Sequence, residues 1–354
     1  MTDLNKYPPA EQWHDWTELD AKAWPDKVEK NYTLIPTTCF NCEAGCGLVA
    51  YHDKETGEIR KIEGNPHHPG SRGRNCAKGP ATLNQIYDTE RVMFPLRRVG
   101  ERGSGQWERI SWEEALTEVG EKIRTAFVEG RKNGVMYHVG RPGEEGYTDR
   151  VLKAWGVDGH NSHTNICSSN ARIGYQSWMG HDRPSSDFAN AKVIFLISSH
   201  LESGHYFNPH AQRIIEAQAN GAKVIACDPR LSNTGAKADY WLPTWPGTEP
   251  FLLLSIARLL IESEEWNAEF VERWVNWETY LKERAPEKSV EFSQLRTALL
   301  EEYAEYTPEA AEQKTGIDAD TIHEIAAVIG ANPTKFASHN WRAAGAGPRA
   351  SVRR

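Results

Sequence analysis

Four cysteines near the N-terminus have the spacing of a metal site. Cys39, Cys42 and Cys46 form a Cys-x2-Cys-x3-Cys run, and Cys76 follows after a further 29 residues. Thiolates in such runs hold either an iron–sulfur cluster or a zinc ion. A structural zinc site usually presents two Cys-x2-Cys knuckles, whereas here the second spacing is three residues and the fourth cysteine stands alone. This asymmetry favours a 4Fe-4S cluster, with zinc as the alternative.

Two further residues could take part in the same chemistry, and a third is expected to be a core cysteine. Lys78 follows Cys76 by two residues, where its ammonium group could link a cluster to an anionic cofactor, although a solvated lysine is the alternative. Cys167 stands alone in a polar segment, and a lone cysteine is more often a small buried hydrophobe than a ligand. Cys227 ends an apolar segment and is expected in the core.

Composition limits the partners. The chain has 354 residues, with 41 basic against 49 acidic side chains and a net charge of -8, which argues against nucleic acid and against a polybasic membrane anchor. The first thirty residues lack the basic and apolar regions of an export signal, so a cytoplasmic location is expected. No apolar stretch approaches the ~20 residues of a membrane span. Peripheral attachment to the inner membrane would depend on partner subunits.

Short strands and one helix must position the N-terminal cysteines. Residues 47–52 and 58–62 alternate in polarity and predict a β-hairpin between Cys46 and Cys76. A loop rich in Pro and Gly then returns the chain to Cys76. Ser111 predicts the N-cap of a helix, followed by a buried strand at 135–139. The apolar stripe expected on this helix comprises Ala115, Leu116, Val119, Ile123 and Phe127.

The second half predicts a parallel sheet. A strand at 192–197, a helix at 209–219 and a strand at 222–227 form one repeating unit of a doubly wound α/β fold. Further helices are expected at 251–262, 268–272 and 277–283, then a helix-turn-helix segment at 308–330 and a strand from 335. Ligands of such sheets bind at the carboxyl ends of the strands.

Polar residues follow these strands. Asp228 and Arg230 come directly after one strand, where a carboxylate suits ribose hydroxyls and a guanidinium suits a diphosphate. His200 follows the preceding strand and is a weaker candidate for contact with a cofactor or substrate.

Four segments, in this order, resemble the N-terminal half of molybdopterin oxidoreductases of the dimethyl sulfoxide reductase superfamily. They are Thr38-Cys-Phe-Asn-Cys-Glu-Ala-Gly-Cys-Gly, Asn75-Cys-Ala-Lys-Gly, Val92-Met-Phe-Pro-Leu-Arg-Arg-Val-Gly and Trp107-Glu-Arg-Ile-Ser-Trp-Glu-Glu-Ala-Leu. The resemblance continues to about residue 345. It implies a 4Fe-4S cluster and molybdenum or tungsten held by bis(molybdopterin guanine dinucleotide).

The resemblance also implies roles for individual residues. Cys167 occupies the place of the protein side chain that binds molybdenum or tungsten, which makes it the expected catalytic ligand. Asp228 and Arg230 match the nucleotide-contacting segment. Glu249 stands where an aspartate that reads guanine is usual, so its reach is longer by one methylene. His163 and Arg172 would be pterin contacts or structural residues.

The expected architecture is α/β, with a small β-rich 4Fe-4S domain followed by doubly wound α/β pterin-binding domains and without the C-terminal barrel of full-length relatives. A second polypeptide is expected to supply the remainder of the large subunit, with a truncated product being the alternative. The predicted divisions are an N-terminal extension (1–32), the 4Fe-4S domain (33–105), the first part of the molybdopterin domain (106–160), an inserted Rossmann-like nucleotide-binding domain (161–325) and an incomplete return segment (326–354).

Among the branches of the superfamily, the segment Asn165-Ile-Cys-Ser-Ser and the loop Gly140-Arg-Pro-Gly-Glu-Glu-Gly-Tyr look most like the large subunit of phenylacetyl-CoA:acceptor oxidoreductase. That resemblance implies oxidation of phenylacetyl-CoA to phenylglyoxylate in anaerobic aromatic catabolism, with water as oxygen source and electrons passing through the cluster to a quinone. An iron–sulfur electron-transfer subunit and a membrane subunit would be partners. The alternatives are a formate dehydrogenase, a reductase of sulfur or arsenic oxyanions, an acetylene hydratase, or a non-catalytic electron-transfer subunit.

Overall fold

A computed structural model of the chain divides into two units. It describes residues 8–42, 44–139, 145–157, 160–162, 169–181, 185–201 and 208–340. The first unit is Met1–Cys167 and the second is Ser168–Arg354. Each unit has its own sheets and core, and each is described by itself.

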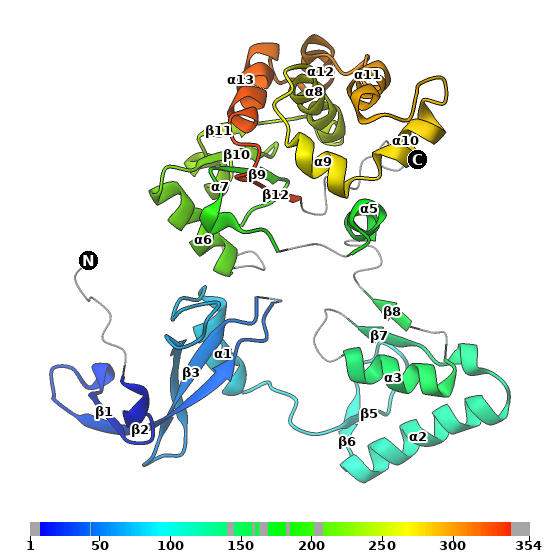
Figure 1. The fold of residues 1–354 in the computed structure, drawn as a ribbon. Coiled ribbons are helices and arrows are strands. Elements are labelled where there is room, and N and C mark those ends of the chain that lie inside the picture. The colour runs from blue at the N-terminus through cyan, green and yellow to red at the C-terminus, as the bar shows by residue number, and fades with distance from the viewer. Residues whose placement is uncertain are drawn as a thin grey trace. The chain divides into compact units, whose positions relative to one another are not determined.

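The first unit begins with an antiparallel sheet in the order β1-β2-β3-β4 (Figure 1). Its strands are β1 (Trp16–Leu19), β2 (Glu29–Thr38), β3 (Gly47–Asp53) and β4 (Ile59–Gly64), and helix α1 (Lys78–Ile86) packs against β4. The predicted hairpin between Cys46 and Cys76 is therefore confirmed as β3 and β4. Strand β1 lies within residues 1–32, which the sequence predicted to be an extension. It pairs with β2, and Trp13 and Trp16 pack against the core of this sheet.

The remainder of the first unit is a smaller α/β segment. It contains β5 (Leu96–Arg98), β6 (Trp107–Arg109), α2 (Trp112–Val128), β7 (Tyr137–Val139), α3 (Glu145–Trp155) and β8 (His160–Ser162). The predicted cap of α2 is confirmed, because Ser111 Oγ accepts from Glu114 N over 3.1 Å and Glu114 Oε2 accepts from Ser111 N over 2.7 Å. The strand predicted at 135–139 is confirmed as β7, but it is shorter, and its predicted burial is wrong because the side chain of Met136 is 70% exposed.

The second unit contains a four-stranded parallel sheet in the order β11-β10-β9-β12. Its elements are α5 (Ser169–Met179), β9 (Val193–Ile197), α6 (Asn208–Ala219), β10 (Lys223–Cys227), α7 (Asn233–Lys237), β11 (Tyr240–Leu242), α8 (Glu249–Glu262), α9 (Ala268–Trp274), α10 (Trp277–Arg284), α11 (Phe292–Glu302), α12 (Pro308–Thr315), α13 (Ala319–Gly330) and β12 (Phe336–Asn340). The expected strand–helix–strand unit is thus confirmed.

Both faces of this sheet are covered. All five side chains of β9 are buried. Val193, Phe195 and Ile197 join a core that includes residues of α8, α12 and α13, whereas Ile194 and Leu196 join a second core with residues of α6. Because successive side chains of a strand point to opposite faces, helices on both faces explain why β9 is apolar throughout. The predicted doubly wound architecture is confirmed.

Strand order reverses at one place in the sheet. From β9 the chain proceeds to β10 and β11 on one side, whereas β12 pairs with β9 on the other side. Such a reversal places a crevice at the carboxyl ends of the two strands, which is where open α/β sheets bind ligands. In the part of the chain that the structure describes, no helix has the length and hydropathy needed to cross a membrane.

Candidate functional site

Pairing of β2 with β3 brings the first and third cysteines together. The last residues in register are Thr38 and Gly47. Directly beyond them, Cys39 N donates a hydrogen bond to Cys46 O over 2.8 Å. Both cysteines are buried and belong to a small apolar core with Leu48, Ala50 and Ile62. Two of the four predicted ligands are therefore neighbours at the loop end of the β2–β3 pair.

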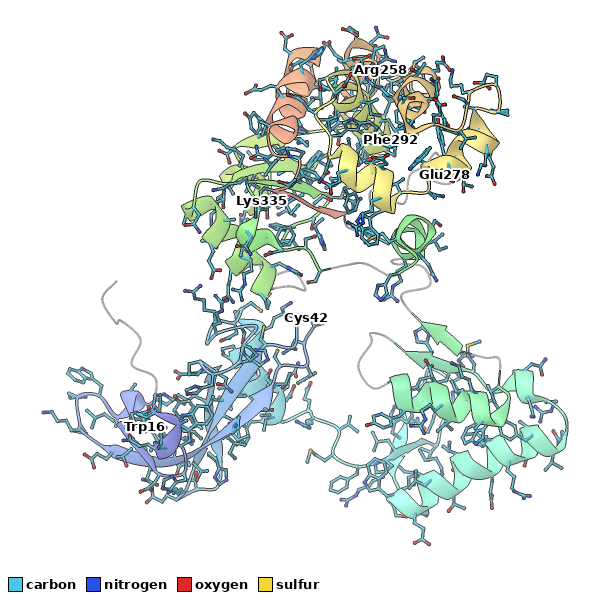
Figure 2. All side chains as sticks on the ribbon, viewed as in Figure 1. Trp16, Cys42, Arg258, Glu278, Phe292 and Lys335 are labelled. Atoms are coloured by element: carbon cyan, nitrogen blue, oxygen red, sulfur yellow. The ribbon has the colours of Figure 1, made fainter. Side chains whose placement is uncertain are left out.

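Cys42 lies in the short loop between these two strands (Figure 2). Its carbonyl oxygen accepts a hydrogen bond from Gly45 N over 3.3 Å, and Gly45 has a φ of 53°. A left-handed conformation costs glycine little, so Gly45 allows the loop to turn within three residues and bring Cys46 back to the sheet. Cys42 is half-buried, more accessible than Cys39 or Cys46.

Close backbone packing returns the chain to Cys76. A Cβ atom on Gly47 would lie 2.4 Å from His68 Cβ, and one on Gly64 would lie 2.0 Å from Gly73 O. Glycine at these two positions lets the 65–75 loop lie directly on β3 and β4. Cys76 then comes just before α1, and its carbonyl oxygen accepts from Gly79 N over 3.1 Å.

Asn41 connects the cysteine loop to α1. Its side-chain Nδ2 lies 3.4 Å from Cys39 Sγ, 3.1 Å from Lys78 O and 3.1 Å from Thr82 Oγ1. Sequence reasoning missed this residue, because no pattern marks an asparagine between two cysteines as a contact for a helix 37 residues away. Asn41 therefore joins the loop that carries Cys39 to the helix that begins two residues after Cys76, an arrangement that we call the cysteine frame.

The donor set of this frame suits an iron–sulfur cluster. Soft thiolate donors with hydrogen bonds to their sulfurs are the usual environment of such clusters. Among the described residues, no three His, Cys, Asp or Glu side chains are arranged so that together they could hold a metal ion. The four-cysteine ligand set therefore stays a prediction.

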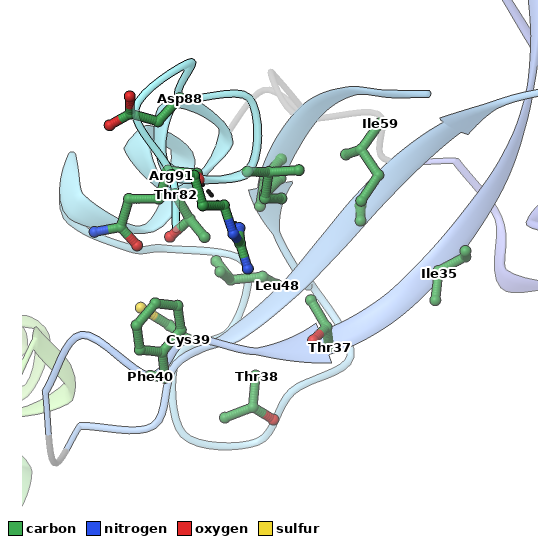
Figure 3. A pocket seen from close by; sticks show the side chains of 14 residues that line it. Ile35, Thr37, Thr38, Cys39, Phe40, Leu48, Ile59, Thr82, Asp88 and Arg91 are labelled. Atoms are coloured by element: carbon green, nitrogen blue, oxygen red, sulfur yellow. Dashed lines mark hydrogen bonds between the residues drawn. The ribbon is translucent and has the colours of Figure 1, made fainter. Parts of the chain in front are cut away.

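A cavity of about 610 Å³ opens beside Cys39 (Figure 3). Its walls are mostly apolar, with Phe40, Leu48 and Ile86 among them, and Arg91 supplies a charged group. The Arg91 guanidinium donates to Gln85 O over 3.1 Å, which holds its side chain against α1. Cys39 therefore lines a cavity between the sheet and α1.

Lys78 is the first residue of α1, and its side chain is exposed. Its backbone carbonyl takes part in the frame through Asn41, while its ammonium group is left to meet solvent or a ligand. The expected role beside an anionic cofactor stays a prediction.

The carboxyl edge of the second unit's sheet gathers the nucleotide candidates. Ser198 N donates to Cys227 O over 2.8 Å, which holds the start of the loop after β9 beside the end of β10. His200 follows in that loop and is half-buried. Asp228 Oδ1 accepts from Arg230 N over 2.8 Å, a turn that leaves the exposed Arg230 guanidinium beyond the strand end.

Glu249 is the first residue of α8 and is buried. Among the atoms that the structure describes, its Oε2 has no hydrogen-bond partner. A buried carboxylate oxygen without a partner is costly, and the positive end of a helix dipole offsets only part of that cost. A ligand with N–H donors at this place would supply the missing partners.

Two residues that sequence reasoning missed lie at the same edge. Ser199 Oγ and Asn340 Oδ1 are buried atoms without a hydrogen-bond partner in the described part of the chain. They follow β9 and end β12, the two strands between which the strand order reverses. Their signal in the sequence is only a polar residue at a strand end.

The two remaining cysteines have different outcomes. Cys227 lies in the sheet core, where burial raises the pKa of its thiol to about 12 even though the thiol contacts Thr244 Oγ1 at 3.4 Å. It is therefore a core residue, as expected. Cys167 and His163 lie outside the described residues, so the proposed metal ligand stays a prediction. Arg172 lies within α5.

The chain matches two established sequence families. Residues 32–88 match the Fe4S4 domain of molybdopterin oxidoreductases, and residues 91–341 match molybdopterin oxidoreductase. A sulfite dehydrogenase chain of Allochromatium vinosum is 32% identical over 73% of this chain and 27% of its own length. The molybdopterin-containing subunit of thiosulfate reductase from Salmonella typhimurium is 28% identical over 83% of this chain and 36% of its own length.

A solved structure agrees with these matches. Acetylene hydratase from Pelobacter acetylenicus superposes with a TM-score of 0.71 and 25% identity, covering 87% of this chain and 40% of that enzyme. The chain therefore spans well under half the length of these relatives. With a cysteine-bearing Fe4S4 domain in front of a long molybdopterin match, the chain belongs to the molybdopterin oxidoreductase family.

Proposed function

We propose that this chain is the cluster-bearing and nucleotide-binding portion of the large subunit of a molybdenum or tungsten pterin oxidoreductase. The observation that carries the proposal is the frame in which the Cys39–Cys46 hydrogen bond closes the cysteine loop and the Asn41 amide joins that loop to α1. When bound, the pterin-held metal exchanges oxygen or hydroxyl with substrate, and the 4Fe-4S cluster carries the electrons.

The four N-terminal cysteines hold the cluster in this proposal. Cys39 and Cys46 contribute from the ends of β2 and β3, Cys42 from the loop and Cys76 from the start of α1. Lys78 extends its ammonium group from the same first turn of α1 towards an anionic pterin. A positive charge between two redox groups lowers the cost of the negative charge that passes between them.

The sheet edge of the second unit binds the guanine nucleotide part of the cofactor. Glu249 accepts hydrogen bonds from the N–H groups of guanine, which would give its buried Oε2 the partner that it lacks among the described atoms. Asp228 accepts from ribose hydroxyls, and Arg230 pairs with the diphosphate. His200, in the loop after β9, contributes a further contact to the cofactor in this proposal. Cys167 is the proposed protein ligand of the metal and the catalytic residue.

Two substrates follow from different observations. The sequence at residues 165–169 and 140–147 supports oxidation of phenylacetyl-CoA to phenylglyoxylate, with water as oxygen source and a quinone as acceptor. The match to the sulfite dehydrogenase chain, at 32% identity, supports sulfur oxyanion chemistry instead. We retain the first as the proposal and the second as its alternative.

Completing the enzyme requires partners. Because the chain covers 27% and 36% of two relatives, we infer that a second polypeptide or polypeptide segment completes the large subunit. An iron–sulfur electron-transfer subunit would accept the electrons, and a membrane subunit would bring the assembly to the quinone.

The test is to purify the chain anaerobically with its co-expressed neighbouring gene products. Dye reduction is then measured with phenylacetyl-CoA, sulfite, thiosulfate and formate, and acetylene hydration is measured without dye. Reduction that depends on phenylacetyl-CoA supports the proposal, and reduction that depends only on sulfite or thiosulfate replaces it with the alternative. A complex that loads the cluster and pterin metal but reduces no dye with any of these substrates contradicts both.

A further inference from the structure

We propose that Asn41 sets the reduction potential of the cluster by donating an N–H hydrogen bond to the sulfur of Cys39. The inference rests on the proposed role of Cys39 as a cluster ligand. The structure places the Asn41 side chain beside the sulfur of Cys39, with Nδ2 at 3.4 Å from Cys39 Sγ.

The orientation of the Asn41 amide follows from its neighbours. The backbone carbonyl of Lys78 can only accept, so the group 3.1 Å from it must be the NH2 end of the amide. Thr82 Oγ1 donates to the same carbonyl over 3.3 Å, which leaves the lone pairs of Thr82 Oγ1 to accept from Asn41. Both contacts require the NH2 group, so it is also what lies 3.4 Å from Cys39 Sγ. The group has two hydrogens for three acceptors, so one of its N–H bonds is shared between two of them.

The same contacts make Asn41 a positioning residue. The amide is half-buried and bonded to the first turn of α1, the turn that begins two residues after Cys76. Its donor direction is therefore set by the helix and not by the loop that carries it. Cys39 itself is 9% exposed.

The direction of the effect follows from charge. Reduction would add one electron to a cluster held by the four cysteines, and no bond of Asn41 would form or break. Part of the added charge falls on the cysteine sulfurs, and a hydrogen bond to such a sulfur favours the more negative form. Asn41 should therefore raise the reduction potential.

The experiment compares Asn41→Leu with the parent and with Asn31→Leu, a matched substitution in β2. Asn31 donates to Asp15 Oδ1 and Thr17 Oγ1 and touches none of the four cysteines in these contacts. The full chain is reconstituted anaerobically with iron and sulfide, and the cluster is titrated with dithionite under electron paramagnetic resonance detection. We expect a lower midpoint potential for Asn41→Leu at unchanged iron content, and the parent's potential for Asn31→Leu.

A second variant keeps the test decisive if Asn41→Leu loses the cluster. Asn41→Ser removes the amide with less change in polarity and should also lower the midpoint potential. The proposal is overturned if both variants keep the parent's potential, or if both lose the cluster, because the latter would show a purely structural role for Asn41. Failure of the parent itself to load iron would instead contradict the proposed cluster site, so the two hypotheses are separable.

Discussion

The backbone N–H of Cys39 donates to the carbonyl oxygen of Cys46 over 2.8 Å, one step beyond the last paired residues of β2 and β3. The sheet register thus decides which cysteines face each other. A register slip of one residue would turn the side chains of β3 to the other face of the sheet. Cys39 and Cys46 would then no longer be paired neighbours.

Loss of any one of the four cysteines should abolish cluster loading. Cys46→Ser replaces a buried sulfur in the frame with a hydroxyl, a poorer ligand for iron. We expect iron and sulfide in the anaerobically reconstituted chain to fall to background. Cys227→Ser is the matched control, because Cys227 lies in the sheet core of the second unit and is not a predicted ligand. Burial there raises the pKa of its thiol to about 12. Normal iron in Cys46→Ser would remove it from the ligand set.

Gly47→Ala tests whether close packing returns the chain to Cys76. An added Cβ would lie 2.4 Å from His68 Cβ, so the 65–75 loop must shift. We expect a loss of unfolding free energy of about 1–3 kcal/mol, as for overpacked cores, together with faster loss of iron to a chelator. Gly120→Ala within α2 is the control, because its Cβ meets no atom within 4 Å. Equal chelator resistance in the two variants would show that the packing of this loop is unimportant for the cluster.

Glu249→Gln tests the guanine site. The substitution keeps the shape of the side chain but weakens it as an acceptor for guanine N–H groups. We expect binding of GDP to the full chain, measured by calorimetry, to weaken about tenfold, or about 1.4 kcal/mol. Glu278→Gln on α10 is the control, as Glu278 is exposed beside Lys282. GDP binding that is the same in both variants would remove Glu249 from the site.

Asp53 should make the first unit sensitive to acid. Burial alone would raise its pKa, but N–H groups of Thr56 and Glu55 and the charge of Lys30 together lower the pKa below the ordinary 3.8. A carboxylate with a depressed folded pKa contributes stability above its unfolded pKa, and this contribution is lost as pH falls through the folded pKa.

The change that reveals this effect is Asp53→Asn, with unfolding free energy measured by urea titration from neutral pH to below the ordinary pKa of 3.8. The variant should be less stable at neutral pH, and the difference from the parent should shrink as the pH falls. Asp26→Asn, in an exposed loop before β2, is the control. A difference for Asp53→Asn that stays constant with pH would contradict the assigned pKa direction.

Local sequence patterns correctly predicted the elements that depend on the types of neighbouring residues in the chain. Strand β9 is apolar at every position and is covered on both faces, and Ser111 with Glu114 forms the capping box that its spacing predicts. The spacing around the cysteines similarly predicted the hairpin of β3 and β4, whereas their role as cluster ligands stays a prediction. In each case a local periodicity or spacing carries the information.

Other features depend on contacts between distant residues and could not be predicted. Strand β11 has three residues and exists because Tyr240–Leu242 pairs with β10. The apolar stripe of α2 indicates a face but not what covers it, and Leu116 is 68% exposed in this structure. The Asn41 amide is bonded to a helix 37 residues later, a relation that no local pattern contains.

Metal analysis of the chain tests the central claim most directly. The chain is purified anaerobically with its co-expressed neighbouring gene products, and iron, molybdenum, tungsten and zinc are measured together. A 4Fe-4S large-subunit portion predicts iron and sulfide with molybdenum or tungsten in the same preparation. Iron without either metal would contradict the catalytic assignment, and zinc without iron would contradict the redox assignment altogether.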